Sequence, residues 1–182
     1  MIMIKKIASI CLLSLIGLGL MAQTKSEVKK MPMATVPLNN ETQLISYTTT
    51  FTSELSDSAL YKRAVHWYKT ENKSMRIQNE NCVQNQKITG RAECDLLGIK
   101  DGKEQPTEGR LKFTVNTEIK NGKVTVEITR FNIQDARYTP IEPWLKLQEN
   151  DLKYKYSFIF IEEYSKKFLE SFVTSVNVQK TK

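Results

Sequence analysis

The chain has 182 residues with 27 basic and 20 acidic side chains, which gives a formal net charge of +7. This length suits one globular domain, and the mild basic excess is spread along the chain. Nucleic-acid-binding proteins concentrate lysine and arginine on one face, so the charge pattern does not predict nucleic acid as a partner. No period of roughly 20 to 50 residues repeats, which excludes solenoids and propellers.

Residues 1–22 have the features of a secretory signal peptide. Lys5 and Lys6 precede an apolar run over residues 7–21, and the small residue Ala22 follows where a signal peptidase cuts. The run is shorter than the roughly 20 residues that cross a bilayer, which disfavours a membrane anchor. We therefore expect cleavage near Ala22, no transmembrane span afterwards, and a protein of the periplasm or cell surface.

Export would leave about 160 residues with a net charge near +5, because two lysines leave with the signal. Residues 23–41 are polar, contain Pro32 and Pro37, and show no sustained apolar period, so we expect a flexible linker. Residues 42–178 are then long enough for a single domain that buries about 70% of its unfolded surface.

The domain begins with a predicted strand and an amphipathic helix. Residues 43–53 are rich in β-branched and aromatic side chains, which favours a strand. Ser56 or Asp57 can cap a helix that runs to about Asn72. At 100° per residue, apolar and polar side chains occupy opposite arcs of this helix. The apolar arc holds Leu60, Tyr61, Ala64, Val65, Trp67 and Tyr68, and the polar arc holds Lys62, Arg63, His66 and Lys69.

His66 is the only histidine of the chain, and it lies among cations on the polar arc. No carboxylate lies within one helical turn to orient the imidazole or raise its basicity. We expect a solvated surface residue without a catalytic or ligand role, and we expect Trp67 to be a core anchor.

Four further strands are predicted, at residues 75–83, 86–98, 110–120 and 123–133. A polar turn near Asn85 joins the first two, and a loop over residues 98–109 follows. Asn121 and Gly122 form the last turn, because a type I′ hairpin needs positive φ at both central positions. Alternation places these side chains inward: Ile88, Gly90, Ala92, Cys94, Leu96, Leu111, Phe113, Val115, Thr117, Ile119, Val124, Val126 and Ile128.

An irregular stretch over residues 134–150 precedes a final helix over residues 152–176. In the irregular stretch, Trp144 either closes one end of the core, which we favour, or joins Arg137 and Tyr138 in a partner-binding surface.

The predicted fold class is α+β. We expect a two-layer sandwich in which an antiparallel sheet of about five strands carries two helices on one face, in the order β-α-β-β-β-β-α. The segments "LYKRAVHWYK", "KITGRAEC" and "IKNGKVTVEITRFNI" resemble a family of exported bacterial domains of unknown function. The resemblance covers about residues 43–175 and implies a fold like that of the TATA-box-binding protein (TBP-like). It implies no activity and no catalytic residues.

The outward side chains of the predicted sheet mix both charge signs, which does not favour DNA binding by this surface. These side chains include Arg91, Glu93, Lys112, Asn116, Glu118, Lys123 and Glu127.

The motifs of common catalytic sites are not matched. Cys82 or Cys94 would need His66 as its base, although His66 is expected to face water. The two cysteines lack the close-set ligand pair of a zinc site. Glu93 and Glu118 could face each other across the sheet, but solvated charge pairs explain them more simply. We therefore predict no catalytic, metal or cofactor residues and no cofactor.

The state of the two thiols stays open at this point. A turn near Asn85 places Cys82 opposite Thr89 rather than Cys94, which favours free buried thiols, whereas a bulge would allow a disulfide.

The function that the sequence favours is an exported, noncatalytic binding or interaction module of the cell envelope. Its open sheet face or the Trp144 loop would contact an envelope protein, a glycan or a lipid. The alternative is a cell-envelope hydrolase whose site the sequence does not reveal.

Overall fold

The computed structural model describes residues 33–72, 74–100, 103–134 and 138–177. The predicted signal peptide and residues 23–32 of the predicted linker lie outside these ranges. The elements are, in order, β1 (Ser46–Thr52), α2 (Asp57–Thr70), β2 (Arg76–Ile77), η1 (Asn79–Asn81), β3 (Lys87–Lys100), β4 (Lys103–Lys120), β5 (Lys123–Gln134), β6 (Tyr138–Pro140), η2 (Glu142–Lys146) and α3 (Leu152–Asn177), where η marks a 3₁₀ helix.

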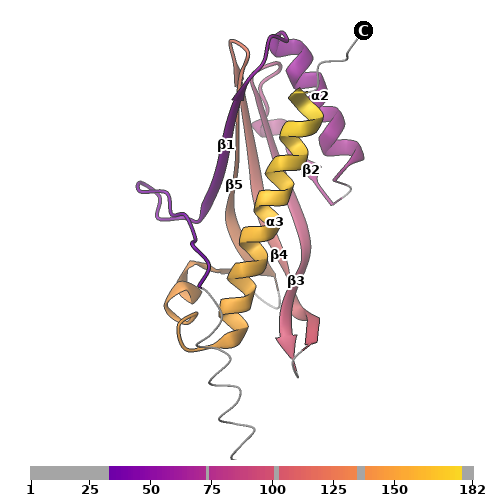
Figure 1. Ribbon diagram of the computed structural model, residues 1–182. Helices are drawn as coiled ribbons and strands as arrows, with labels where there is room; N and C mark the ends of the chain where they lie inside the picture. Colours follow the sequence, from indigo (N-terminus) through magenta and orange to yellow (C-terminus); the bar gives the residue numbers. More distant parts are fainter. Residues whose placement is uncertain (1–32, 73, 101–102, 135–137, 178–182) are drawn as a thin grey trace, which may run out of the picture.

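The strands form one antiparallel sheet, and both α-helices lie on the same face of it (Figure 1). The strand order is β1-β5-β4-β3-β2, and the short β6 pairs with β5. Helix α3 runs along the sheet, and α2 packs beside it over β3 and β4. The predicted two-layer α+β sandwich is therefore confirmed, with β6 as an additional strand.

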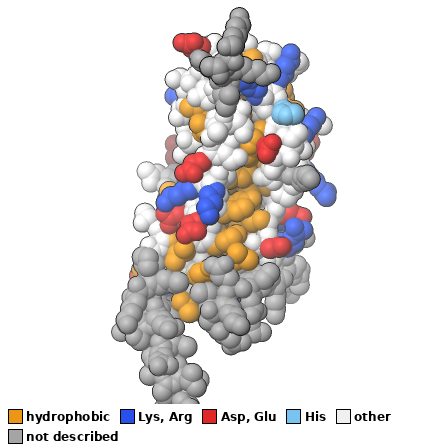
Figure 2. All heavy atoms as spheres, turned by 45° about the vertical axis from the view of Figure 1, so that its right-hand side comes forward, with side chains coloured by type: hydrophobic (Ala, Val, Ile, Leu, Met, Phe, Trp, Pro, Cys, Tyr) orange, Lys and Arg blue, Asp and Glu red, His pale blue; other side chains and the backbone are white. Residues whose placement is uncertain are grey.

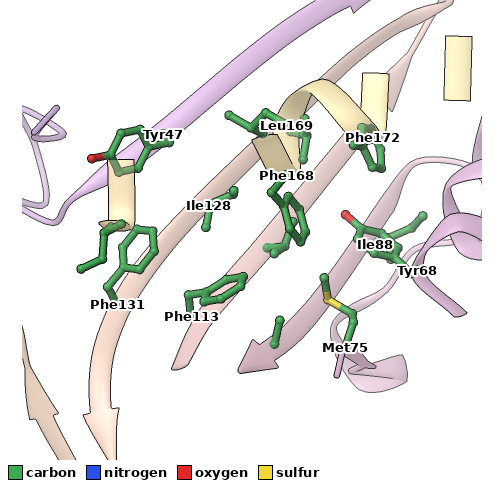
Figure 3. Packing of buried hydrophobic residues seen from close by; sticks show 14 of the residues in the cluster. Tyr47, Tyr68, Met75, Ile88, Phe113, Ile128, Phe131, Phe168, Leu169 and Phe172 are labelled. Carbon is green, nitrogen blue, oxygen red and sulfur yellow. The ribbon is translucent and has the colours of Figure 1, made fainter. Parts of the chain in front are cut away.

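The core lies between the inner face of the sheet and the two helices (Figure 3). The inward side chains of β3, β4 and β5 alternate with outward polar ones, as the period of two predicts. Phe113 on β4 lies 5.9 Å from Phe168 on α3, measured between ring centroids, and 5.7 Å from Phe131 on β5. Burial of apolar side chains such as these rings supplies the main stabilising free energy of the fold.

Helix α2 begins and packs as its sequence predicts. The Ser56 hydroxyl accepts a hydrogen bond from the Ala59 amide at 3.3 Å, which caps the helix. The Trp67 side chain is buried, and His66 is exposed at the surface, where Figure 2 shows it in pale blue. Arg63 departs from the prediction, because it is half-buried and its guanidinium donates to the carbonyl oxygen of Val176 at 3.2 Å.

The predicted Asn121–Gly122 turn is also present, with φ of 53° and 73°. The carboxylate of Asp57, at the start of α2, accepts hydrogen bonds from both turn amides, at 3.0 Å and 2.8 Å. A Cβ atom added to Gly122 would lie 2.6 Å from the carbonyl oxygen of Ser53, so the turn also needs glycine for space.

Two predicted segments were wrong. The strand expected at residues 75–83 pairs only at Arg76–Ile77 and then turns through η1, where two asparagines favour a turn over a strand. The loop expected at residues 98–109 is instead a hairpin, because β3 continues to Lys100 and β4 starts at Lys103. Pro106 is compatible with this strand because the pairing of β4 with β5 covers only Arg110–Lys120.

Candidate functional site

The outer face of the sheet, opposite the helices, carries a groove across β2, β3, β4 and β5. Two adjoining hollows of about 450 and 530 Å³ make up this groove and share four lining residues. The shared residues are Gln78, Arg91, Thr114 and Arg130. Arg76 and Asn132 line the first hollow as well. We refer to the region around these six residues as the outer groove.

The strand register arranges its side chains in one row across the sheet. Arg76 on β2 pairs directly with Arg91 on β3, and Arg91 pairs with Thr114 on β4. Thr114 in turn pairs with Thr129 on β5, and Arg130 is the next residue. The row therefore gathers three arginines from three strands, β2, β3 and β5.

A β-bulge places Arg130 in this row. Lys112 pairs with Asn132, but Thr114 pairs with Thr129, so that two residues of β5, Arg130 and Phe131, stand opposite one residue of β4. Arg130 has φ of 56°, in the left-handed region that is costly for a residue with a Cβ atom. The extra residue lets Phe131 enter the core while Arg130 stays exposed and lines the groove.

Asn132 holds the bulge in place. Its side-chain amide donates to the carbonyl oxygens of Arg130 at 3.0 Å and Lys112 at 3.3 Å. The residue is 7% exposed, and its Oδ1 has no hydrogen-bond partner among the described residues. An unpartnered buried polar atom is unusual, because buried polar groups are almost always hydrogen-bonded.

Two carboxylates of the outer face, Glu93 and Glu127, are engaged by other side chains, whereas Glu80, which lines the second hollow, forms no ion pair within 4.0 Å among the described residues. Glu93 accepts from Arg110 at 2.7 Å and lies 3.5 Å from the ammonium group of Lys112. Glu127 accepts from the Ser46 hydroxyl at 2.6 Å and from the Asn116 amide at 3.3 Å.

The three groove arginines, by contrast, have no carboxylate within 4.0 Å in the described part of the chain. Arg76 and Arg91 also stand directly opposite each other, an arrangement of like charges that destabilises a sheet. The outer groove therefore carries uncompensated positive charge.

Glu93 and Glu118 do not face each other across the sheet. Glu93 stands opposite Lys112, whereas Glu118 stands opposite Lys87 on one side and Thr125 on the other. Two glutamates in these positions cannot flank one bond of a substrate. Glu93 instead forms charge pairs with Arg110 and Lys112, which is the interpretation that the sequence favoured.

Both thiols are free, so the disulfide alternative is not realised. The Cys82 thiol donates to the carbonyl oxygen of Gln78 at 3.2 Å. Burial raises the pKa of Cys94 to about 11, an effect that its hydrogen bond with the Tyr164 hydroxyl reduces only in part. A thiol with this pKa is protonated at neutral pH and is a poor nucleophile. In the residues that the structure describes, no group of three or more His, Cys, Asp or Glu side chains is placed to hold a metal ion.

The three residues predicted to bind a partner are only partly visible. Arg137 and the side chain of Tyr138 lie outside the described residues, and the backbone of Tyr138 starts β6. Trp144 is half-buried in η2, packs against the core, and lies 5.0 Å from the Tyr154 ring between centroids. A shared surface of the three residues stays a prediction.

Comparison with known proteins places the fold. Residues 47–134 match the family model described as a domain of unknown function (DUF4468) with a TBP-like fold. A crystal structure of a DUF4468 family protein from Bacteroides ovatus is 13% identical, with a TM-score of 0.59 over 81% of this chain and 93% of that one. A TBP-like protein from Parabacteroides distasonis is 15% identical, with a TM-score of 0.52 over 77% of this chain and 98% of that one. Comparison with curated proteins gives no match.

Proposed function

We propose that this chain, whose residues 47–134 carry a DUF4468 domain with a TBP-like fold, is an exported, noncatalytic binding module of the cell envelope that binds its partner on the outer face of its sheet. The observation that carries the proposal is the outer groove, in which Arg76, Arg91 and Arg130 have no carboxylate partner among the residues that the structure describes. The helices occupy the other face, so the outer face is the one that remains available within the described residues.

Binding fits the groove better than catalysis does. One acid lines each hollow of the groove among the described residues: Arg110 and Lys112 already neutralise Glu93, and Glu80 lines the second hollow without a histidine in its lining. Cys94 stays protonated at neutral pH because burial raises its pKa, and His66 is exposed on the outer arc of α2. A nucleophile needs a base within hydrogen-bond distance, and these side chains do not supply one in the groove.

The outer groove is also a better candidate surface than the Trp144 loop. Trp144 packs against the core and against Tyr154, which supports its role as the cover of one end of the core. The groove arginines are exposed and make no such contacts in the described structure.

Export is part of the proposal and rests on Lys5, Lys6, the apolar run and Ala22. No helix among the described residues is both long and apolar enough to cross a membrane. Fractionation of cells that express the full chain, followed by N-terminal sequencing of the product, tests export. A product that starts near Gln23 in the envelope fraction supports it, and an uncleaved cytoplasmic chain contradicts it.

Site-specific photo-crosslinking in intact cells tests the binding surface. A photoreactive residue at Thr114 reports on the centre of the groove, and one at Thr174, exposed on α3, serves as the matched control. We expect a discrete crosslinked product from position 114 and not from position 174, with mass spectrometry to identify what is attached. The same pattern from both positions, or a product from position 174 alone, would contradict the proposal.

A further inference from the structure

We infer that the outer groove binds a small anion with two or more negative charges, and that Arg76, Arg91 and Arg130 contact its carboxylate or phosphate oxygens. This inference rests on the proposed function and names the chemistry of the ligand. It starts from the arrangement of the three guanidinium groups and not from the net charge of the chain.

The geometry of the sheet sets the size of the ligand. Neighbouring strands lie about 4.8 Å apart, so the backbones of Arg76 and Arg91 are one strand apart and Arg130 is about 10 Å from Arg91, across Thr114. Flexible arginine side chains on this spacing can converge on one ligand from both sides. Hollows of about 450 and 530 Å³ are of the size that small-molecule ligands occupy.

Three locally unfavourable features meet at this row. Arg76 and Arg91 are like charges in direct register, Arg130 adopts a left-handed backbone conformation, and the buried Asn132 oxygen has no partner in the described ranges. None of these features improves the sheet, since an acidic residue at 76 or a glycine at 130 would suit it better. Locally unfavourable features of this kind are typical of functional sites in proteins.

The chemistry of the groove selects an anion. Arginine presents a planar set of donors that matches carboxylate and phosphate groups in pairs of hydrogen bonds. An anion between Arg76 and Arg91 would also remove their mutual repulsion. Gln78, Thr114 and Asn116 add neutral polar groups that can bind hydroxyl or ester oxygens.

A long polyanion fits this surface less well. Glu93, Glu118 and Glu127 project from the same outer face, so an extended chain of phosphates would pass over acidic side chains. The favourable potential is confined to the row of arginines, which favours a compact ligand over a nucleic acid or a membrane surface.

The test is a calorimetric titration of the exported chain at low ionic strength with pyrophosphate and, separately, with citrate. We expect saturable binding of at least one, and the stronger of the two distinguishes phosphate from carboxylate as the preferred group. Arg91→Gln and Arg130→Gln should each weaken binding by roughly tenfold or more, because each removes a charged donor. Lys62→Gln, which removes an exposed charge on α2, should leave binding unchanged.

Specific results would overturn the inference. If neither anion shows saturable binding up to about 10 mM, the inference is refuted, because a Kd of that size means very weak binding. Equal losses of anion affinity in Lys62→Gln and Arg91→Gln would also refute it. Binding of vesicles rich in anionic lipid without binding of either small anion would also refute it. Arg130→Gly guards against misfolding as the cause of a loss, because this change relieves backbone strain while it removes the guanidinium.

The two proposals can fail separately. If the photoreactive residue at position 114 crosslinks to a partner, and does so equally well in a chain that also carries Arg91→Gln, the groove binds through other chemistry. In that case only the inference of an anionic ligand fails. If Thr114 gives no product and neither anion binds, the proposed function fails as well.

Discussion

Arg130 links the stability of the sheet to the proposed binding, and its replacement by glycine separates the two effects. With φ of 56°, the arginine carries a left-handed penalty of about 1.5 kcal/mol that glycine does not. Glycine gains freedom in the unfolded chain worth about 0.5–1 kcal/mol, so the net gain in unfolding free energy is about 0.5–1 kcal/mol. For a domain of this size the melting temperature should rise by about 1–4 °C.

Arg130→Ala is the matched control, because alanine also removes the guanidinium but retains the Cβ atom. Thermal unfolding followed by circular dichroism should rank glycine above alanine, and both variants should lose the binding of citrate or pyrophosphate. The loss of repulsion between neighbouring arginines is common to both variants and cancels in the comparison. Equal melting temperatures, or a more stable alanine variant, would mean that residue 130 does not have the left-handed conformation and that the bulge argument is wrong.

Three further predictions concern the fold. Trp67→Ala should lower the unfolding free energy by about 3–5 kcal/mol in urea titrations, whereas His66→Ala should leave it unchanged; similar losses would contradict the assigned helix faces. Gly122→Ala should cost about 1–3 kcal/mol, because φ is 73° and the added Cβ would meet the Ser53 carbonyl oxygen; an unchanged melting temperature would count against the turn. Stability should fall as the pH rises from about 9 towards 11, since the unfolded Cys94 thiol ionises near its ordinary pKa of 9.0 and the folded one only near 11. Cys94→Ala should reduce that slope in urea titrations, most clearly below about pH 10, because Tyr47 and Tyr164, whose pKa values burial raises above the ordinary 10.0, add to the slope above it. An unchanged slope below about pH 10 would show that Cys94 is not its source.

The inner face of the sheet was predictable because the alternation of apolar and polar side chains can be recognised within each strand. Side chains from Ile88 to Leu96, and again from Leu111 to Ile119, alternate with period two, and burial follows that alternation. The Asn121–Gly122 turn was predictable because few residue pairs tolerate positive φ twice in succession. The two helices followed from the three- and four-residue spacing of their apolar side chains.

The outer groove was not predicted, because it depends on register between strands. No sequence pattern within a single strand predicts that Arg76 pairs with Arg91 or that Thr114 lies between Arg91 and Arg130. One local signal was present, however. The apolar residues of β5 fall at even positions through Val124, Val126 and Ile128 and then at odd positions from Phe131 onward. Such a change of phase indicates an extra residue in a strand, which is the bulge at Arg130.

The long β3–β4 hairpin was missed for a different reason. Glycine, proline and charged residues over residues 98–109 are typical of a loop, and these residues nonetheless pair, from Leu97 with Pro106 to Lys100 with Lys103. The structural context overrides propensity here, since the pairing of β3 with β4 continues through this segment. Strand content alone therefore could not set the length of this hairpin.

Alternation along the strands keeps the groove and the core physically separate. Arg91 and Thr114 can change without loss of apolar contacts, because their neighbours Ala92, Phe113 and Val115 face the helices. The bulge couples the two faces of the sheet, because the same extra residue places Phe131 in the core and Arg130 in the groove. For this reason Arg91→Gln should alter binding with little effect on stability, whereas Arg130→Gly should alter both, because glycine removes the guanidinium and also the Cβ atom that makes the left-handed conformation costly.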